Sequence, residues 1–153
     1  MSSKHKGDNM SKLFVVVVII VFMYVILSEM NESTPIMPNM SLIPELRNAR
    51  VAGIMFLSGD IDMTFDQIIS IWPGINTGNT NFGDYMDNPG KLKDYSFIVV
   101  PDPETSEIML LVGKRINDPV LASKMIGLIG GNLFGPTGHA FTETDGYVYM
   151  RVK

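Results

Sequence analysis

The sequence contains no cysteine, one tryptophan and only two histidines. Without cysteine the chain has no disulfide, no thiol nucleophile and no cysteine ligand for zinc or an iron–sulfur cluster. Beyond the first twelve residues, His139 is the only histidine. We expect it to be a partly buried strand residue and not a general base. A domain of this composition must rely on its apolar core for stability.

Catalytic and metal-binding motifs are also missing. No serine stands in the Gly-x-Ser-x-Gly context of a nucleophile elbow. The glycines between Gly127 and Gly138 lack the Gly-Lys-Ser/Thr ending of a phosphate loop and follow a predicted helix instead of preceding one. Asp60, Asp62 and Asp66 lack the glycine and glutamate that complete a calcium loop. The sequence therefore predicts that the protein is not an enzyme and holds no metal and no cofactor.

Positive charge is in the minority, with 12 Lys and Arg against 16 Asp and Glu and a net charge of −4. Residues 1–12 carry three lysines against Asp8, whereas residues 13–153 carry nine Lys and Arg against fifteen Asp and Glu. A nucleic-acid-binding domain needs a basic face. We therefore expect no nucleic acid among the partners.

A run of fifteen uncharged residues, Leu13–Leu27, separates the basic tail from the acidic remainder. A cleaved secretory signal would need a small-residue cleavage site, and a prepilin leader would need a glutamate inside the run; neither is present. The favoured interpretation is an uncleaved transmembrane helix over residues 13–28. The positive-inside rule then places residues 1–12 in the cytoplasm and the following domain in the periplasm or outside the cell, with the chain in the inner (cytoplasmic) membrane.

Residues 29–43 contain Pro35 and Pro38 and have no clean period, which predicts a linker. Residues 44–153 then form one small extracytoplasmic domain. We expect helices at 44–50, at 64–72 behind the Thr64-Phe65-Asp66-Gln67 capping box, and at 119–130 behind the Asp118-Pro119 start signal. The apolar residues 51–57 fit either a helix or a buried strand.

Two continuous apolar segments, 96–100 and 107–113, predict an antiparallel strand pair. Asp145-Gly146 is typical of a two-residue hairpin turn, which would place Phe141 opposite Met150 and His139 opposite Val152. The predicted fold is α+β: an N-terminal transmembrane helix, then an antiparallel sheet of four to five strands with two to three helices.

The segment 74–95 is rich in glycine and asparagine and has no regular pattern. A structureless stretch of this length is either functional or mobile. Its large apolar groups Phe82 and Tyr85 could either hold the loop on the domain or contact a partner. Together with Trp72 just before the segment, they are the predicted partner-contact residues.

The order of features from Trp72 onward resembles the small inner-membrane accessory protein of type IVb thin-pilus systems. The features are the Trp72-Pro73 step after a short helix, the Gly/Asn loop, the apolar strand Ser96–Val100, and the segments 119–123 and 131–135. The chain departs from the family in the insertion Glu107–Arg115 and in the Asp145-Gly146 hairpin. The resemblance implies a role in envelope assembly, and it assigns no functional residues.

The preferred hypothesis is a single-pass, membrane-anchored structural or assembly component of a bacterial envelope machine, a pilus or a secretion system. Its partners would be the lipid bilayer and other envelope-assembly proteins, and homo- and hetero-oligomers both stay open. The alternative is an anchored extracytoplasmic binding domain that uses the 74–95 loop. An envelope hydrolase with paired carboxylates is the least favoured hypothesis.

Overall fold

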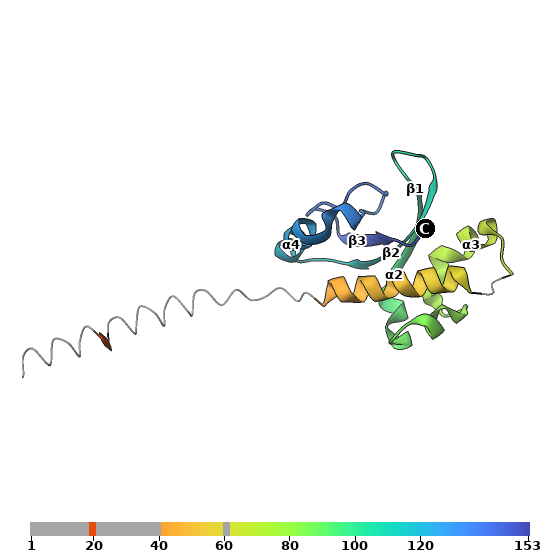
Figure 1. Cartoon of the computed structure of the whole chain (residues 1–153), viewed down its shortest axis with the longest axis horizontal. Coiled ribbons are helices and arrows are strands. Elements are labelled where there is room, and N and C mark those ends of the chain that lie inside the picture. The colour runs from red at the N-terminus through yellow and green to blue at the C-terminus, as the bar shows by residue number, and fades with distance from the viewer. Residues whose placement is uncertain (1–18, 21–40, 60–61) are drawn as a thin grey trace, which may run out of the picture. The chain divides into compact units, whose positions relative to one another are not determined.

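The computed structural model describes residues 19–20, 41–59 and 62–153 (Figure 1). The chain divides into two units, Met1–Pro38 and Asn39–Lys153. In the first unit only Ile19 and Ile20 are described, both helical and exposed. The second unit holds the sheet, its covering helices and the core.

The predicted transmembrane helix over residues 13–28 lies outside the described residues, apart from Ile19 and Ile20. Among the helices that the structure describes, none combines the length and the hydropathy needed to cross a bilayer. The fold prediction is therefore corrected to an α+β domain without such a helix. Most of the predicted linker 29–43 also lies outside the described part, and its last two residues belong to the first helix of the domain.

The long helix α2, Leu42–Ser58, covers both the predicted helix 44–50 and the ambiguous residues 51–57. Its buried residues recur at helical spacing and include Leu46, Ala49 and Phe56, so the apolar run forms the inner face of one helix. Gly53 lies on this face, where an added Cβ would come within 2.9 Å of Val152. The close approach of the chain end to the helix therefore explains a glycine in a helix interior.

The sheet has three antiparallel strands in the order β1-β2-β3: β1 Ser96–Pro101, β2 Ile108–Arg115 and β3 Tyr147–Arg151. The predicted pair 96–100 and 107–113 is confirmed as β1 and β2. The predicted sheet of four to five strands is wrong for the described chain. Strand β3 pairs with β2, and on its other side Phe134 forms only an isolated bridge to Tyr149.

The predicted hairpin at Asp145-Gly146 is also wrong, because residues 141–146 fold into turns. The carboxylate of Asp145 accepts hydrogen bonds from the N–H and the hydroxyl of Thr142, at 2.8 and 3.0 Å. These side-chain hydrogen bonds replace the backbone hydrogen bonds that a strand would make with its neighbour. Phe141 nevertheless packs in the same cluster as Met150, the residue that the predicted hairpin places opposite it.

The shorter helices agree with their sequence signals. Helix α3, Phe65–Ile71, begins with the predicted capping box between Thr64 and Gln67. Helix α4, Pro119–Ile129, begins after Asp118, whose side chain accepts hydrogen bonds from the backbone N–H groups of Val120 and Leu121. The helix predictions at 64–72 and 119–130 are thus confirmed, and the end of α4 continues into the 3-10 helix η4, Gly130–Asn132.

The glycine- and asparagine-rich segment is ordered into three 3-10 helices: η1 Trp72–Thr77, η2 Asn81–Tyr85 and η3 Pro89–Asp94. Each contributes buried apolar side chains to the core. The buried residues of these three helices are Trp72, Ile75, Phe82 and Leu92.

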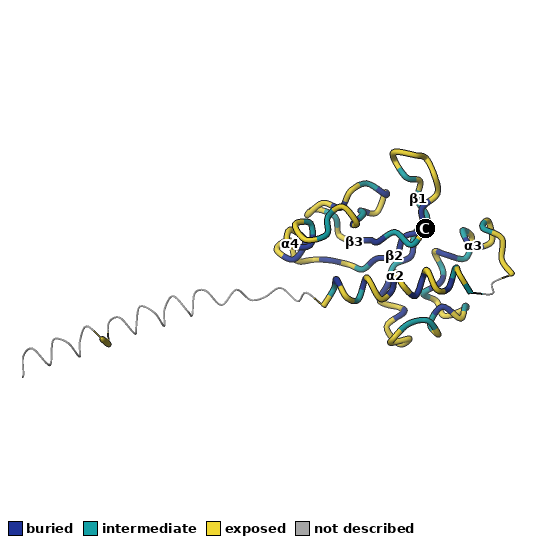
Figure 2. Tube along the Cα trace, in the orientation of Figure 1, coloured by how far each residue is buried: buried dark blue, intermediate teal, exposed yellow. Residues whose placement is uncertain are grey.

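Both faces of the sheet are covered. On one face, residues of α2 belong to two clusters, one with α3 and the 3-10 helices η1 to η3, the other with α4 and Phe141. Figure 2 marks buried residues in dark blue on β2, on β3 and along α2. On the opposite face Met109, Leu111 and Tyr149 pack with Phe134. Helix α2 is therefore the element that joins the two halves of the core.

Candidate functional site

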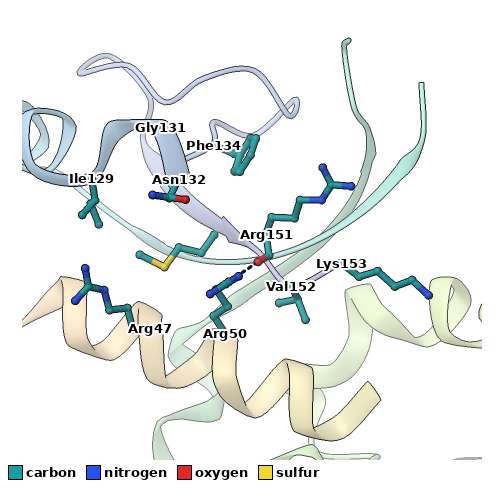
Figure 3. Close-up of a pocket in the computed structure, with 10 residues that line it drawn as sticks. Arg47, Arg50, Ile129, Gly131, Asn132, Phe134, Arg151, Val152 and Lys153 are labelled. Atoms are coloured by element: carbon teal, nitrogen blue, oxygen red, sulfur yellow. Dashed lines mark hydrogen bonds between the residues drawn. The ribbon is translucent and has the colours of Figure 1, made fainter. Parts of the chain in front are cut away.

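A cleft of about 510 Å³ lies between α2, the α4–η4 segment and the C-terminal end of β3. We call it the basic cleft because three arginines and a lysine line it, without any aspartate or glutamate (Figure 3). Its lining residues are Arg47, Arg50, Ile129, Gly131, Asn132, Phe134, Met150, Arg151, Val152 and Lys153.

The α2 wall of the basic cleft follows from helix geometry. Arg47 and Arg50 are three residues apart, so they share one side of the helix, while Leu46 and Ala49 are fully buried on another. Figure 3 shows both arginines projecting from α2 toward η4 and β3. Because the buried side of α2 packs in the core, the backbone that carries the two arginine side chains is held in a fixed position.

Arg50 also binds the end of the sheet. Its Nε–H donates a hydrogen bond of 2.7 Å to the backbone carbonyl of Arg151. This contact uses one of the five N–H donors of the guanidinium group and leaves the terminal nitrogens for a further acceptor. The partner is a neutral carbonyl, so the charge of Arg50 is not offset by it.

The four cations differ in their partners. Arg151 lies 3.2 Å from the carboxylate of Asp102, and Lys153 lies over the ring of Phe65 at 4.4 Å. Arg47 and Arg50 have no carboxylate partner within the part of the chain that the structure describes. These two guanidinium groups are therefore available to an external anion.

The charge of the surroundings makes this cluster unusual. Residues 41–153 contain nine Lys and Arg against thirteen Asp and Glu. Four of those nine cations line one cleft that has no acidic residue. The field of the cleft is thus opposite in sign to the net charge of its domain.

The remaining walls are partly apolar. Ile129 comes from the end of α4, Phe134 from the bridge beside β3, and Met150 and Val152 from β3 and the residue after it. Asn132 adds an amide that can donate or accept. The volume is within the usual range of about 300–1,000 Å³ for ligand sites, and an anionic group beside apolar side chains fits this lining.

A second polar group lies in the loop before β3. The two ring nitrogens of His139 contact the hydroxyl of Thr137 at 2.6 Å and the carboxylate of Asp145 at 3.0 Å. Burial would raise the pKa of Asp145, but hydrogen bonds from Thr142 and His139 outweigh it and lower the pKa. His139 lies in this loop and not in a strand opposite Val152, so that prediction is wrong.

This order of hydroxyl, imidazole and carboxylate is found in hydrolases, yet here it closes a turn. An added Cβ on Gly135 would come within 2.4 Å of the His139 ring, so the imidazole packs directly on the backbone of its own loop. None of the three residues lines the basic cleft. The hydrogen bonds of this group stabilise the loop that carries Phe134.

A smaller cavity of about 120 Å³ lies beside Glu45 and Asp87. Its acidic groups already have partners: Glu45 pairs with Lys114, and Asp87 accepts from Asn48 at 3.0 Å. Tyr95 also lines it, and burial together with the charge of Glu45 raises the pKa of Tyr95 to about 12. Within the described ranges, no group of three or more metal-binding side chains is arranged to hold an ion.

The predicted contact residues Trp72, Phe82 and Tyr85 meet in one aromatic cluster. Trp72 and Phe82 are fully buried, and the indole N–H of Trp72 donates to the carbonyl of Leu111 at 3.0 Å. Tyr85 is half-buried and packs edge-on against Phe56, with ring centres 6.2 Å apart. The first two are core residues in this structure, which leaves only Tyr85 with a partly exposed side chain.

Sequence reasoning missed the basic cleft. Arg151 lies 101 residues after Arg50, and no local pattern joins Arg47 and Arg50 to it. The one available signal was the pair of arginines on a single helix side.

Compared with protein-family models, with curated proteins and with solved structures, the chain gives no match. The resemblance to the thin-pilus accessory protein therefore stays a prediction from the sequence.

Proposed function

We propose that this chain is a non-catalytic structural or assembly component of a bacterial envelope machine, and that it acts through protein–protein contacts made at the basic cleft. The observation that supports the proposal is the pair of guanidinium groups, Arg47 and Arg50, without carboxylate partners in a cleft free of acidic residues. Such a surface is typical of a binding site.

The alternative, a binding domain that uses the 74–95 segment, has less support. Two of its three proposed contact residues are fully buried, so a partner could reach them only if the core opened. The hydrolase hypothesis has less support still, because no described aspartate or glutamate lines the basic cleft to form the expected pair of carboxylates. The location at the inner membrane depends on Leu13–Leu27 and stays a prediction.

Photo-crosslinking of the full chain in the cells that express it tests the proposal. A photoreactive phenylalanine analogue replaces Asn132, which is exposed and lines the basic cleft, or Ser123, an exposed residue of α4 that does not line it. We expect a discrete adduct with one protein from position 132 and none from position 123. Equal labelling from both positions, or no adduct from 132, would contradict the proposal.

A further inference from the structure

The basic cleft also indicates what kind of partner segment it receives. Arg47 has all five guanidinium donors free among the described contacts, and Arg50 keeps its terminal nitrogens after donating Nε–H to Arg151. A planar fork of N–H donors matches the two oxygens of a carboxylate better than any other protein group.

The spacing of the two arginines favours an extended segment. Residues three apart on a helix have Cβ atoms roughly 5–6 Å apart. In an extended chain, side chains at alternate positions lie about 6.6–6.8 Å apart on one face. Two carboxylates separated by one residue therefore match Arg47 and Arg50, and the intervening side chain points to the opposite wall.

The opposite wall carries apolar side chains beside Asn132 and Arg151. Ile129 and Phe134 line the side of the basic cleft across from α2 (Figure 3). An inorganic anion would leave these side chains unused, whereas an apolar residue between two acidic ones would cover them. The net negative charge of residues 41–153 also disfavours a polyanion surface such as nucleic acid or an anionic bilayer.

Resting on the proposed function, we infer that the basic cleft binds an extended acidic segment of a partner protein, in which two carboxylates flank one apolar residue. The carboxylates pair with Arg47 and Arg50. The apolar side chain packs against Ile129 and Phe134.

The test uses the purified full chain in a neutral detergent and a dye-labelled peptide made of Glu-Val-Glu repeats, with binding followed by fluorescence anisotropy. The matched peptide has Gln in place of Glu. Each lost charge-assisted pair is expected to weaken binding about tenfold, so Arg47→Gln should raise the Kd by that factor and the double variant with Arg50→Gln by about a hundredfold. Binding should weaken as salt increases.

Arg115→Gln is the control variant, because Arg115 is an exposed arginine that does not line the basic cleft. It should leave the Kd unchanged. Arg47→Lys keeps the charge but loses the fork, and it should bind less tightly than the wild type. Equal binding of the Gln peptide, or an equal loss in Arg115→Gln, would overturn the inference.

Two competitors separate the other sources of an anion. Short-chain phosphatidylglycerol or inorganic phosphate should not displace the Glu peptide at concentrations that do not disrupt the detergent micelles. If the lipid displaces the peptide from the wild type but not from Arg47→Gln, the cleft binds a lipid headgroup. If phosphate displaces the peptide, the cleft binds a free ion. Either result overturns the inference.

The crosslinking experiment separates failure of this inference from failure of the proposed function. If the adduct from position 132 forms but maps to a partner segment without acidic residues, the function stands and the inference fails. If no adduct forms, both fail.

Discussion

Phe82 gives the sharpest test of whether the 74–95 segment belongs to the core or to a contact surface. Its side chain is fully buried, and its ring centre lies 5.3 Å from Phe56, 6.2 Å from Trp72 and 5.1 Å from Phe97. The change Phe82→Ala removes most of a buried ring and three aromatic contacts. We expect it to destabilise the domain strongly.

The magnitude follows from the packing. Fully burying such a side chain contributes roughly 1.5–3 kcal/mol by transfer alone, and the residual cavity brings Phe→Ala in a core to about 3–5 kcal/mol. Because Phe82 touches three other rings, we expect the upper half of that range. This is a large share of the roughly 5–15 kcal/mol that stabilises a typical domain.

The single tryptophan supplies the assay. Trp72 is fully buried against Phe82 and Phe97, so its fluorescence reports exposure of this core during urea unfolding. For a loss of about 4 kcal/mol and an m value of about 2 kcal/mol/M, the midpoint should fall by about 2 M urea. Phe82→Leu, a milder change, should still fold and lose about 1 kcal/mol.

Tyr85→Ala is the matched control, because Tyr85 is half-buried and contacts Phe56 at the edge of the same cluster. It should cost no more than about 1–2 kcal/mol. If Phe82→Ala leaves the urea midpoint within about 0.3 M of the wild type, the assignment of Phe82 to the core is wrong.

Two further changes test the sheet and an ion pair. Gly113→Ala should lower stability by about 1–3 kcal/mol, because its Cβ would lie 2.3 Å from the ring of Tyr149; an unchanged urea midpoint would refute this. The hydrogen bond from Lys114 outweighs burial and lowers the pKa of Glu45 below that of an unpaired glutamate. Stability from this pair is therefore fully present above the pKa of Glu45 in the unfolded chain and is lost as the pH falls through the lowered pKa. Glu45→Gln should accordingly unfold with a flatter acid dependence in urea titrations between about pH 7 and 3.

The sequence predicts those elements whose signals are local. Asp118 with Pro119 marks the start of α4, and Thr64 with Gln67 marks the start of α3, because each signal lies within one helical turn of the backbone groups that it caps. The β1–β2 pair is predictable for the same reason, since only a short turn separates the two apolar segments.

The hairpin prediction failed because a side chain competed with the backbone. Asp145-Gly146 is typical of a tight turn between strands, but the carboxylate of Asp145 is bonded to Thr142 and His139 and holds the preceding residues in a turn. The strand Tyr147–Arg151 then pairs with β2, more than thirty residues earlier in the chain. No local pattern encodes that choice of partner.

Composition alone does not tell whether the 74–95 segment is ordered. Glycine and asparagine indicate irregular backbone, yet the few apolar side chains among them, Ile75, Phe82 and Leu92, are enough to hold three 3-10 helices on the core. The same large side chains that suggested a contact surface are the ones that bury the segment. The residue type of a large apolar side chain does not by itself tell whether that side chain is buried or exposed.

Helix α2 links the fold to the proposed site. Its inner face packs in both halves of the core through residues such as Leu46 and Phe56, which fixes the axis and rotation of the helix. Arg47 and Arg50 are held in place by that packing, and Arg50 is further held by the carbonyl of Arg151. Two cations on one side of a helix without a carboxylate partner repel each other, and the hydrogen bond from Arg50 to Arg151 is the described contact that offsets this repulsion. No described contact does the same for Arg47, so its position is better explained by an external anionic group than by the stability of the domain.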